Sequence, residues 1–254
     1  CMVGEELGRQ LCYRSSQKIK MRYFSLHGAE SSIAVNVRTN EKCFFLLGGS
    51  ITAAEVCQRL CSYGLGDVRV YIGSRLGYDD EELHCGTAAE MCGIATDRLT
   101  VIIVESHGYI RYVPSGIRDE EFIRGGVPMT KSEVRCSIVA GLNVERSSVC
   151  WDIGCGTGSV SVEMAYRCTD GCVWAFDKSG EAVSLTDENA RKFSCDNIRV
   201  AEGTCPQCLS EAPTPDKVFI GGSSGQLSGI FDCIYGKNPA ADVTVAAVSL
   251  ETLS

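Results

Sequence analysis

The chain has 254 residues, a formal net charge of −8 at pH 7 and a hydrophobic fraction of 44%, values typical of a globular protein with two modest domains or one large one. The acidic balance and the lack of a Lys- or Arg-rich block disfavour nonspecific binding to nucleic acid. No apolar run reaches transmembrane length and no basic-apolar signal segment opens the sequence, so we expect a cytoplasmic protein without a nucleic-acid or membrane partner.

The first part of the chain predicts an α/β unit. Thr52 and Glu55 form a capping box at the start of a helix whose apolar residues recur on one face until Gly64. The expected elements are strand 42–47, the helix from Thr52 to Gly64, strand 68–72, a short helix capped by Thr87 and Glu90, and strand 99–104. Because the strands are too apolar to be half exposed, we expect a sheet covered on both faces.

A segment without periodicity, residues 106–117, predicts a linker between domains at 1–105 and 118–254. The second domain alternates helical and strand patterns, which predicts a doubly wound parallel sheet. The expected elements are a helix from a Thr130-x-x-Glu133 capping box through Leu142, strands 149–153, 172–177, 197–202, 217–221 and 242–248, and helices 159–167, 180–193 and 224–235. Such sheets bind ligands at the carboxyl ends of their strands, near the point where the strand order reverses.

The turn Gly154-Cys155-Gly156-Thr157-Gly158 follows strand 149–153 and is preceded by Asp152. Glycines at such a strand-to-helix turn let backbone approach a nucleotide-like ligand. The dinucleotide form of the motif has a third Gly where this chain has Ser159. Asp177 ends the next strand, nineteen residues after Gly158, in a position to accept both ribose hydroxyls. Since no pyrophosphate needs a cradle, the pattern predicts S-adenosylmethionine as cofactor, the alternative being a glycine turn without a ligand.

Sixteen cysteines are scattered along the chain without the spacing of a disulfide framework. One C-x-x-C motif joins Cys205 and Cys208, but neither a second pair nor nearby histidines accompany it. We therefore expect no metal and mostly buried, reduced thiols. Cys155 is either a reactive thiol in the turn or, as small buried cysteines more often are, a core residue.

Short motifs flank the glycine turn. They are GIRDEEFI at 116–123, VPMTKSEVR at 127–135, FIGGS at 219–223 and LET at 250–252. With the turn, they make residues 116–254 resemble the decarboxylating carbon-15 precorrin methyltransferases of cobalamin biosynthesis. The resemblance implies an incomplete, Rossmann-like class I S-adenosylmethionine-dependent methyltransferase sheet, truncated after its fifth strand.

Residues 22–105 resemble the α/β C-terminal subdomain of the tetrapyrrole methylases that alkylate carbon 5. The matching stretches are SLHG at 25–28, the strand end at 46–50, LGYDDE at 76–81, GTAAE at 86–90 and LTVIIVE at 99–105. The two enzymes occur fused in this order. The resemblance therefore implies a bifunctional carbon-5, carbon-15 methyltransferase cut at both ends, with the first unit lacking its N-terminal glycine-rich subdomain.

The implied reaction is methylation of a precorrin or cobalt-precorrin tetrapyrrole at carbon 15, with loss of carbon dioxide from an acetate arm. Carbon-5 methylation would belong to the incomplete first unit, and we expect a homo-oligomer. The second domain contains no histidine, which suits a reaction run by positioning rather than by a His base. The rival interpretations are a methyltransferase for RNA or protein on the same fold and a truncated non-catalytic module.

Candidate site residues follow from the motifs and from the implied family, and no catalytic residue is assigned. The cofactor-binding candidates are Thr130, Asp152, Gly154, Cys155, Gly156, Thr157, Gly158, Asp177 and, through backbone groups, Thr204 and Cys205. The candidates for substrate carboxylates are Arg118, Arg124, Lys131, Arg135, Gly221, Gly222, Ser223 and Ser224, with His27 for the carbon-5 substrate. Their alternatives are solvated surface charges, a tight strand-to-helix turn and a structural histidine.

Overall fold

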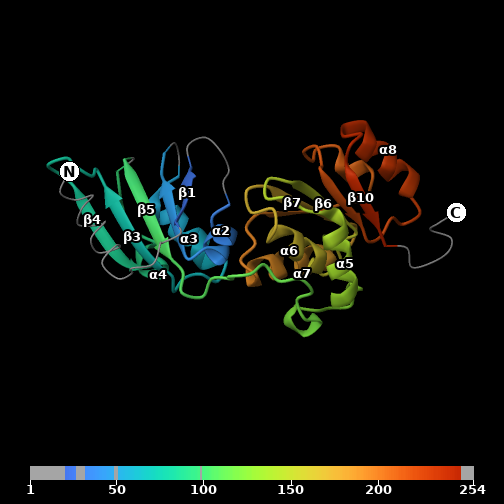
Figure 1. The fold of residues 1–254 in the computed structure, drawn as a ribbon, viewed down its shortest axis with the longest axis horizontal. Helices are drawn as coiled ribbons and strands as arrows, with labels where there is room; N and C mark the ends of the chain where they lie inside the picture. Colours follow the sequence, from blue (N-terminus) through green and yellow to red (C-terminus); the bar gives the residue numbers. More distant parts are fainter. Residues whose placement is uncertain (1–20, 27–31, 49–50, 98, 247–254) are drawn as a thin grey trace. The chain divides into compact units, whose positions relative to one another are not determined.

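The computed structural model describes residues 21–26, 32–48, 51–97 and 99–246. The chain separates into two compact units, residues 1–112 and 113–254, which we describe one at a time. Figure 1 traces both along the sequence. Among the described residues, no helix has the length and apolar character needed to cross a membrane.

The first unit contains a five-stranded mixed sheet in the order β1-β2-β5-β3-β4. Its strands are β1 (Met21–Ser25), β2 (Lys42–Leu46), β3 (Arg69–Ser74), β4 (Glu82–Thr87) and β5 (Thr100–Glu105), and its helices are α2 (Ala34–Thr39), α3 (Ala53–Ser62) and α4 (Ala88–Met91). Strands β1 and β2 run parallel, and the other neighbours are antiparallel. Both capping boxes are confirmed: Thr52 caps α3 together with Glu55, and Thr87 caps α4 together with Glu90.

The described helices of this unit pack on one face of the sheet, so the expectation of two covered faces is wrong for the described residues. Phe45 and Ile72 share one core cluster with Leu60 of α3. On the opposite face, Leu46 is 43% exposed and Tyr23 is 71% exposed. The reason is the antiparallel pairing, which allows one face to remain solvated.

The second unit contains a five-stranded, all-parallel sheet in the order β10-β9-β6-β7-β8. Its strands are β6 (Val149–Ile153), β7 (Cys172–Asp177), β8 (Ile198–Glu202), β9 (Lys217–Ile220) and β10 (Asp242–Val245). Its helices are α5 (Ser132–Leu142), α6 (Ser159–Ala165), α7 (Gly180–Lys192) and α8 (Leu227–Lys237), with short 3-10 helices at Asp119–Glu121 and Gln207–Leu209. The doubly wound sheet is confirmed, and positions 247 and 248 of the last predicted strand lie outside the described residues.

Helices α5, α6 and α7 cover one face of this sheet and α8 covers the other (Figure 1). The second face holds a core around Trp151 and Phe176, against which Ile230 and Ile234 of α8 pack. The strand order reverses at β6, which lies between β7 and β9. In a parallel sheet this reversal opens a crevice at the carboxyl ends of the strands.

Helix α5 begins one residue later than the capping-box pattern of the sequence predicts. The residue before its first turn is Lys131, which makes no side-chain cap, so the predicted capping box of Thr130 is wrong. The carboxylate of Asp119 replaces it by accepting the Ser132 amide hydrogen at 3.0 Å. A side chain thirteen positions back therefore satisfies the helix start, which no local pattern announces.

Candidate active site

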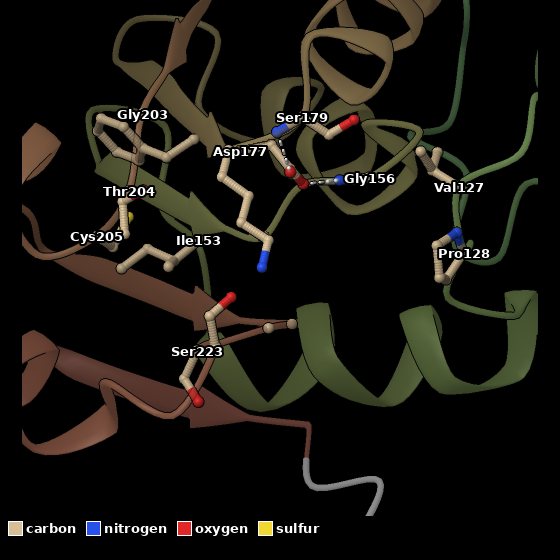
Figure 2. Close-up of a pocket in the computed structure, with 16 residues that line it drawn as sticks. Val127, Pro128, Ile153, Gly156, Asp177, Ser179, Gly203, Thr204, Cys205 and Ser223 are labelled. Atoms are coloured by element: carbon tan, nitrogen blue, oxygen red, sulfur yellow. Dashed lines mark hydrogen bonds between the residues drawn. The ribbon is translucent and has the colours of Figure 1, made fainter.

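A cavity of about 360 Å³ lies at the carboxyl ends of β6, β7, β8 and β9 (Figure 2). Its size falls in the range of roughly 300–1,000 Å³ that is usual for small-ligand sites. Its lining residues are Val127, Pro128, Ile153, Gly154, Gly156, Phe176, Asp177, Lys178, Ser179, Gly203, Thr204, Cys205, Gly221, Gly222, Ser223 and Ser224. The cavity occupies the crevice that the reversed strand order creates.

The glycines of the first turn are required by neighbouring backbone as well as by space for a ligand. Gly154 and Gly156 have φ values of +77° and +57°, a region that disfavours other residues. A Cβ on Gly154 would lie 2.7 Å from the Gly222 nitrogen, and one on Gly156 would lie 2.7 Å from the Pro128 carbonyl oxygen. Besides the close approach to a ligand that the sequence predicts, these glycines therefore let three loops meet.

Asp177 connects the turn after β6 to the turn after β7. Its Oδ2 accepts the Gly156 amide hydrogen at 3.0 Å, and its Oδ1 accepts the Ser179 amide hydrogen at 3.0 Å. Figure 2 shows both bonds at the edge of the cavity. Each carboxylate oxygen still has a lone pair for a ligand hydroxyl.

Asp152 lies beneath the turn and does not line the cavity. Its Oδ2 accepts a 2.5 Å hydrogen bond from Ser161, whereas its Oδ1 has no partner among the described residues. Burial raises the pKa of this carboxyl to about 7. Asp152 therefore supports the turn from within the core and titrates near neutrality.

Three further turn residues that we assigned to cofactor binding have no side chain in the cavity wall. The Cys155 thiol lies against Thr186, which donates to it at 3.3 Å, and burial raises the thiol pKa. The Thr157 hydroxyl is buried without a partner among the described residues, and Gly158 caps α6. The geometry favours the core interpretation of Cys155. Thr130 also lies outside the cavity wall.

The basic residues of the 118–135 segment do not reach the cavity. Arg135 is fully buried; its Nε donates to Glu163 at 2.9 Å and its Nη1 to Asp119 at 2.9 Å. Its assignment to substrate carboxylates is therefore wrong, because two protein carboxylates already occupy it. Arg118 and Lys131 are exposed and pair with Glu121 and Asp119 respectively, and Arg124 is exposed.

The remaining candidates lie around the cavity as expected from their strand ends. Gly203, Thr204 and Cys205 follow β8, and Figure 2 shows Thr204 and Cys205 across the cavity from Val127 and Pro128. Gly221, Gly222, Ser223 and Ser224 follow β9. His27 lies outside the described residues.

Sequence reasoning missed Lys178 as a cavity residue, although it directly follows Asp177 at the end of β7. It also missed Val127 and Pro128, which reach the cavity from the loop before α5. The signal for Lys178 was its position, because residues at the carboxyl end of a parallel strand face the crevice. Lys178 supplies a positive charge to the cavity lining that the assigned arginines do not.

Residues 120–254 match the family model of the precorrin methyltransferase domain. The chain is 41% identical over 145 residues to a probable cobalt-precorrin-6B C(15)-methyltransferase (decarboxylating) of Pyrobaculum calidifontis, covering 56% of this chain and 74% of that protein. It is 37% identical over 139 residues to the Salmonella typhimurium protein named cobalt-precorrin-6B C(15)-methyltransferase (decarboxylating), covering 54% and 71%.

Two solved structures with similar sequence and fold are also precorrin methyltransferases. A precorrin-6Y C5,15-methyltransferase from Geobacter metallireducens is 34% identical with a TM-score of 0.53, over 56% of this chain and 77% of that chain. The C-terminal domain of the Rhodobacter capsulatus protein of that name is 30% identical with a TM-score of 0.50, over 55% and 74%. Since the family model spans more than half of the sequence, the chain belongs to the precorrin methyltransferase domain family of S-adenosylmethionine-dependent enzymes.

Proposed function

We propose that the second unit methylates a precorrin-type tetrapyrrole at carbon 15 and promotes decarboxylation of an acetate arm, in the biosynthesis of cobalamin. The observation that carries this proposal is the cavity formed by the glycine turn and Asp177, within the residues that match the family model. The position of methylation, carbon 15, and the decarboxylation are those in the names of the two relatives described above.

The cavity residues fit S-adenosylmethionine. Asp177 offers free carboxylate lone pairs to the ribose hydroxyls, and Gly154 and Gly156 present bare backbone beside it. Thr204 and Cys205 present backbone groups for the adenine, in place of a side-chain carboxylate. When bound, the cofactor supplies an electrophilic methyl group on sulfur.

The chain positions the second substrate and excludes water from it. Lys178, Ser223 and Ser224 line the cavity and offer a cation and two hydroxyl donors to a substrate rich in carboxylates. Ile153 and Phe176 provide apolar wall. No histidine is among the cavity residues, which agrees with a reaction on an electron-rich carbon that needs alignment rather than deprotonation.

We propose that residues 1–105 are the C-terminal part of a carbon-5 tetrapyrrole methylase, joined by a linker at 106–117 to the carbon-15 domain at 118–254. The support is the set of motifs in the first unit and the names of two solved relatives, which mention both carbons. We also propose that the protein is a homo-oligomer, lies in the cytoplasm and has no nucleic-acid partner. Light scattering tests the oligomeric state.

The test supplies the chain with a methyl-labelled cofactor and either precorrin-6B or cobalt-precorrin-6B, and follows the product by mass spectrometry. We expect a product that gains one labelled methyl group and loses carbon dioxide. Fragmentation that places the methyl group at carbon 5 would instead assign activity to the first unit. Transfer to RNA or protein in place of the tetrapyrrole would contradict the proposal in favour of the rival methyltransferase classes.

A further inference from the structure

The C-x-x-C motif, left unexplained by the proposed function, brings two thiols together at the cavity. Cys205 lies two residues before the short 3-10 helix Gln207–Leu209 that follows β8, and Cys208 lies within that helix. Their Sγ atoms are 3.2 Å apart, and both side chains are half-buried. A disulfide requires an S–S distance of about 2.05 Å, so the sulfurs need to approach by only about 1.2 Å.

Both cysteines contact the cavity wall. Cys205 lines the cavity directly. Cys208 packs beneath Gly203, because a Cβ placed on Gly203 would lie 2.7 Å from the Cys208 Cβ, and Gly203 is itself a lining residue. The loop is held by a hydrogen bond from the Cys208 amide to Thr204 and is anchored by the buried Leu209. Drawing the sulfurs together therefore acts on the wall formed by residues 203–205.

A metal site does not account for the pair. Throughout the part of the chain that the structure describes, no His, Cys, Asp or Glu completes a group of three around these thiols. Cys61 and Cys92 in the first unit form a similar pair, with Sγ atoms 3.3 Å apart and no place in the cavity wall. The second pair provides a matched comparison, because its sulfur separation differs by only 0.1 Å.

We propose that Cys205 and Cys208 form a reversible redox site that weakens cofactor binding when it closes to a disulfide. The inference rests on the proposed function for its coupling to the cofactor. The oxidant is a low-molecular-weight disulfide. One cysteine thiolate attacks it, forms a mixed disulfide and releases one small thiol. The second cysteine thiolate then attacks the protein sulfur of that mixed disulfide and releases the other small thiol. Two cysteine thiols are oxidised, and one small disulfide is reduced to two thiols.

The experiment equilibrates the full chain with oxidised glutathione at mildly alkaline pH, because burial raises the pKa of Cys205 and so lowers the fraction of reactive thiolate at neutral pH. Peptide mapping then locates the disulfide, and calorimetry measures the affinity for S-adenosylhomocysteine before and after oxidation. We expect a Cys205–Cys208 bond, a loss of affinity of roughly fivefold or more, and recovery with dithiothreitol. By linkage, saturating S-adenosylhomocysteine should disfavour oxidation by the same factor.

Two variants separate this site from the other thiols. Cys208→Ser should remove the response of affinity to oxidised glutathione, whereas Cys61→Ser should leave it unchanged. The proposal is overturned by the absence of a Cys205–Cys208 bond, by pairing of Cys205 with Cys233 instead, or by a bond that leaves affinity unchanged. A reduced chain that binds no S-adenosylhomocysteine would overturn the proposed function and with it the coupling, while the mass data would still report on the disulfide itself.

Discussion

Asp177 shapes the cavity and presents charge to it with one carboxylate. Its two oxygens accept the amide hydrogens of Gly156 and Ser179. A carboxylate offers roughly four lone-pair sites, so about two remain for the ribose hydroxyls. Replacing this residue affects both the turn and the ligand, and stability and affinity must be measured separately.

Asp177→Ala should weaken S-adenosylhomocysteine binding by about 1.5–3 kcal/mol, the usual value for hydrogen bonds to a charged group. Calorimetric titration measures the loss of affinity. Thermal unfolding shows whether the substitution also destabilises the turn. Asp187→Ala is the matched control, since that carboxylate pairs with Arg191 on the outer surface of α7. Equal affinities for the Asp177 variant and the parent chain would remove Asp177 from the site.

Two cavity glycines differ in what a methyl group would meet. Gly154→Ala should cost about 1–3 kcal/mol of stability, because its φ is +77° and its Cβ would strike the backbone of Gly222. Gly222→Ala should change stability by less than about 0.5 kcal/mol, since nothing lies within 4 Å of its Cβ. Urea unfolding compares the two, and similar losses would show that the loops do not meet as described. By the same reasoning, Gly156→Val should lower the stability of the fold as well as the affinity for the cofactor.

Asp152 makes stability depend on pH. Its pKa is about 7 in the folded chain against an ordinary value of 3.8, so between these values the folded state holds the proton and the unfolded state loses it. Its contribution to stability is therefore complete below about pH 4 and is lost as the pH rises through about 7. Asp152→Asn should flatten the fall in urea midpoint between about pH 4 and about pH 7. Asp187→Asn is the control. If the urea midpoint of Asp152→Asn depends on pH as that of the control does, the raised pKa is contradicted.

The site was only partly accessible to sequence reasoning. Asp177 and the serines after β9 were found because strand ends in a parallel sheet converge in a known place. Arg135 was misassigned because a basic residue in a helix normally lies at the surface, and only the fold shows that Glu163 lies beside it. Lys178 was overlooked because its residue type is typical of the surface, and only its position directly after β7 indicated the cavity.

At the scale of elements, one buried ion pair holds the loop that contributes Pro128 to the cavity wall. Arg135 on α5 donates to the carbonyl groups of Ile117 and Thr130, the two ends of the loop that carries Pro128. Glu163 on α6 accepts from Arg135 at 2.9 Å and from the Ile117 amide at 3.1 Å. The pair therefore ties both loop ends to two helices.

Arg135→Met should lower the free energy of unfolding by about 3–5 kcal/mol, because it leaves Glu163 buried without its cation. Arg118→Gln should change it by less than about 0.5 kcal/mol, since Arg118 is 75% exposed and its pairing is solvated. Chemical denaturation measures both values. A small loss for Arg135→Met would contradict this prediction, because it would show that Glu163 tolerates burial without its cation.

The elements of the second unit were predictable because parallel strands buried on both faces appear as short apolar runs. The first unit was harder for the same physical reason. Strand β4 carries Glu82 and His84 at an edge of the sheet and has no apolar alternation to reveal it. Strand β1 and the six-residue α2 were also missed, because such short elements offer few periodic positions.

At the scale of the whole molecule, the two units differ in the topology of their sheets. The second sheet is parallel throughout and its order reverses at β6, which creates the crevice at the carboxyl ends. The first sheet is mixed among the described residues, where only β1 and β2 run parallel. Fold alone does not exclude a second ligand, so the number of sites has to be counted.

We expect one S-adenosylhomocysteine to bind per chain, in the cavity of the second unit. Equilibrium dialysis with labelled ligand gives the number of sites directly. Asp177→Ala combined with Gly154→Ala should abolish the saturable binding, because these changes remove the ribose acceptor and disturb the turn beside it. Circular dichroism of the same double variant checks that the two sheets persist. Two sites in the parent chain, or one site that survives in the double variant, would place a donor site in the first unit and contradict the division of roles argued from its mixed sheet.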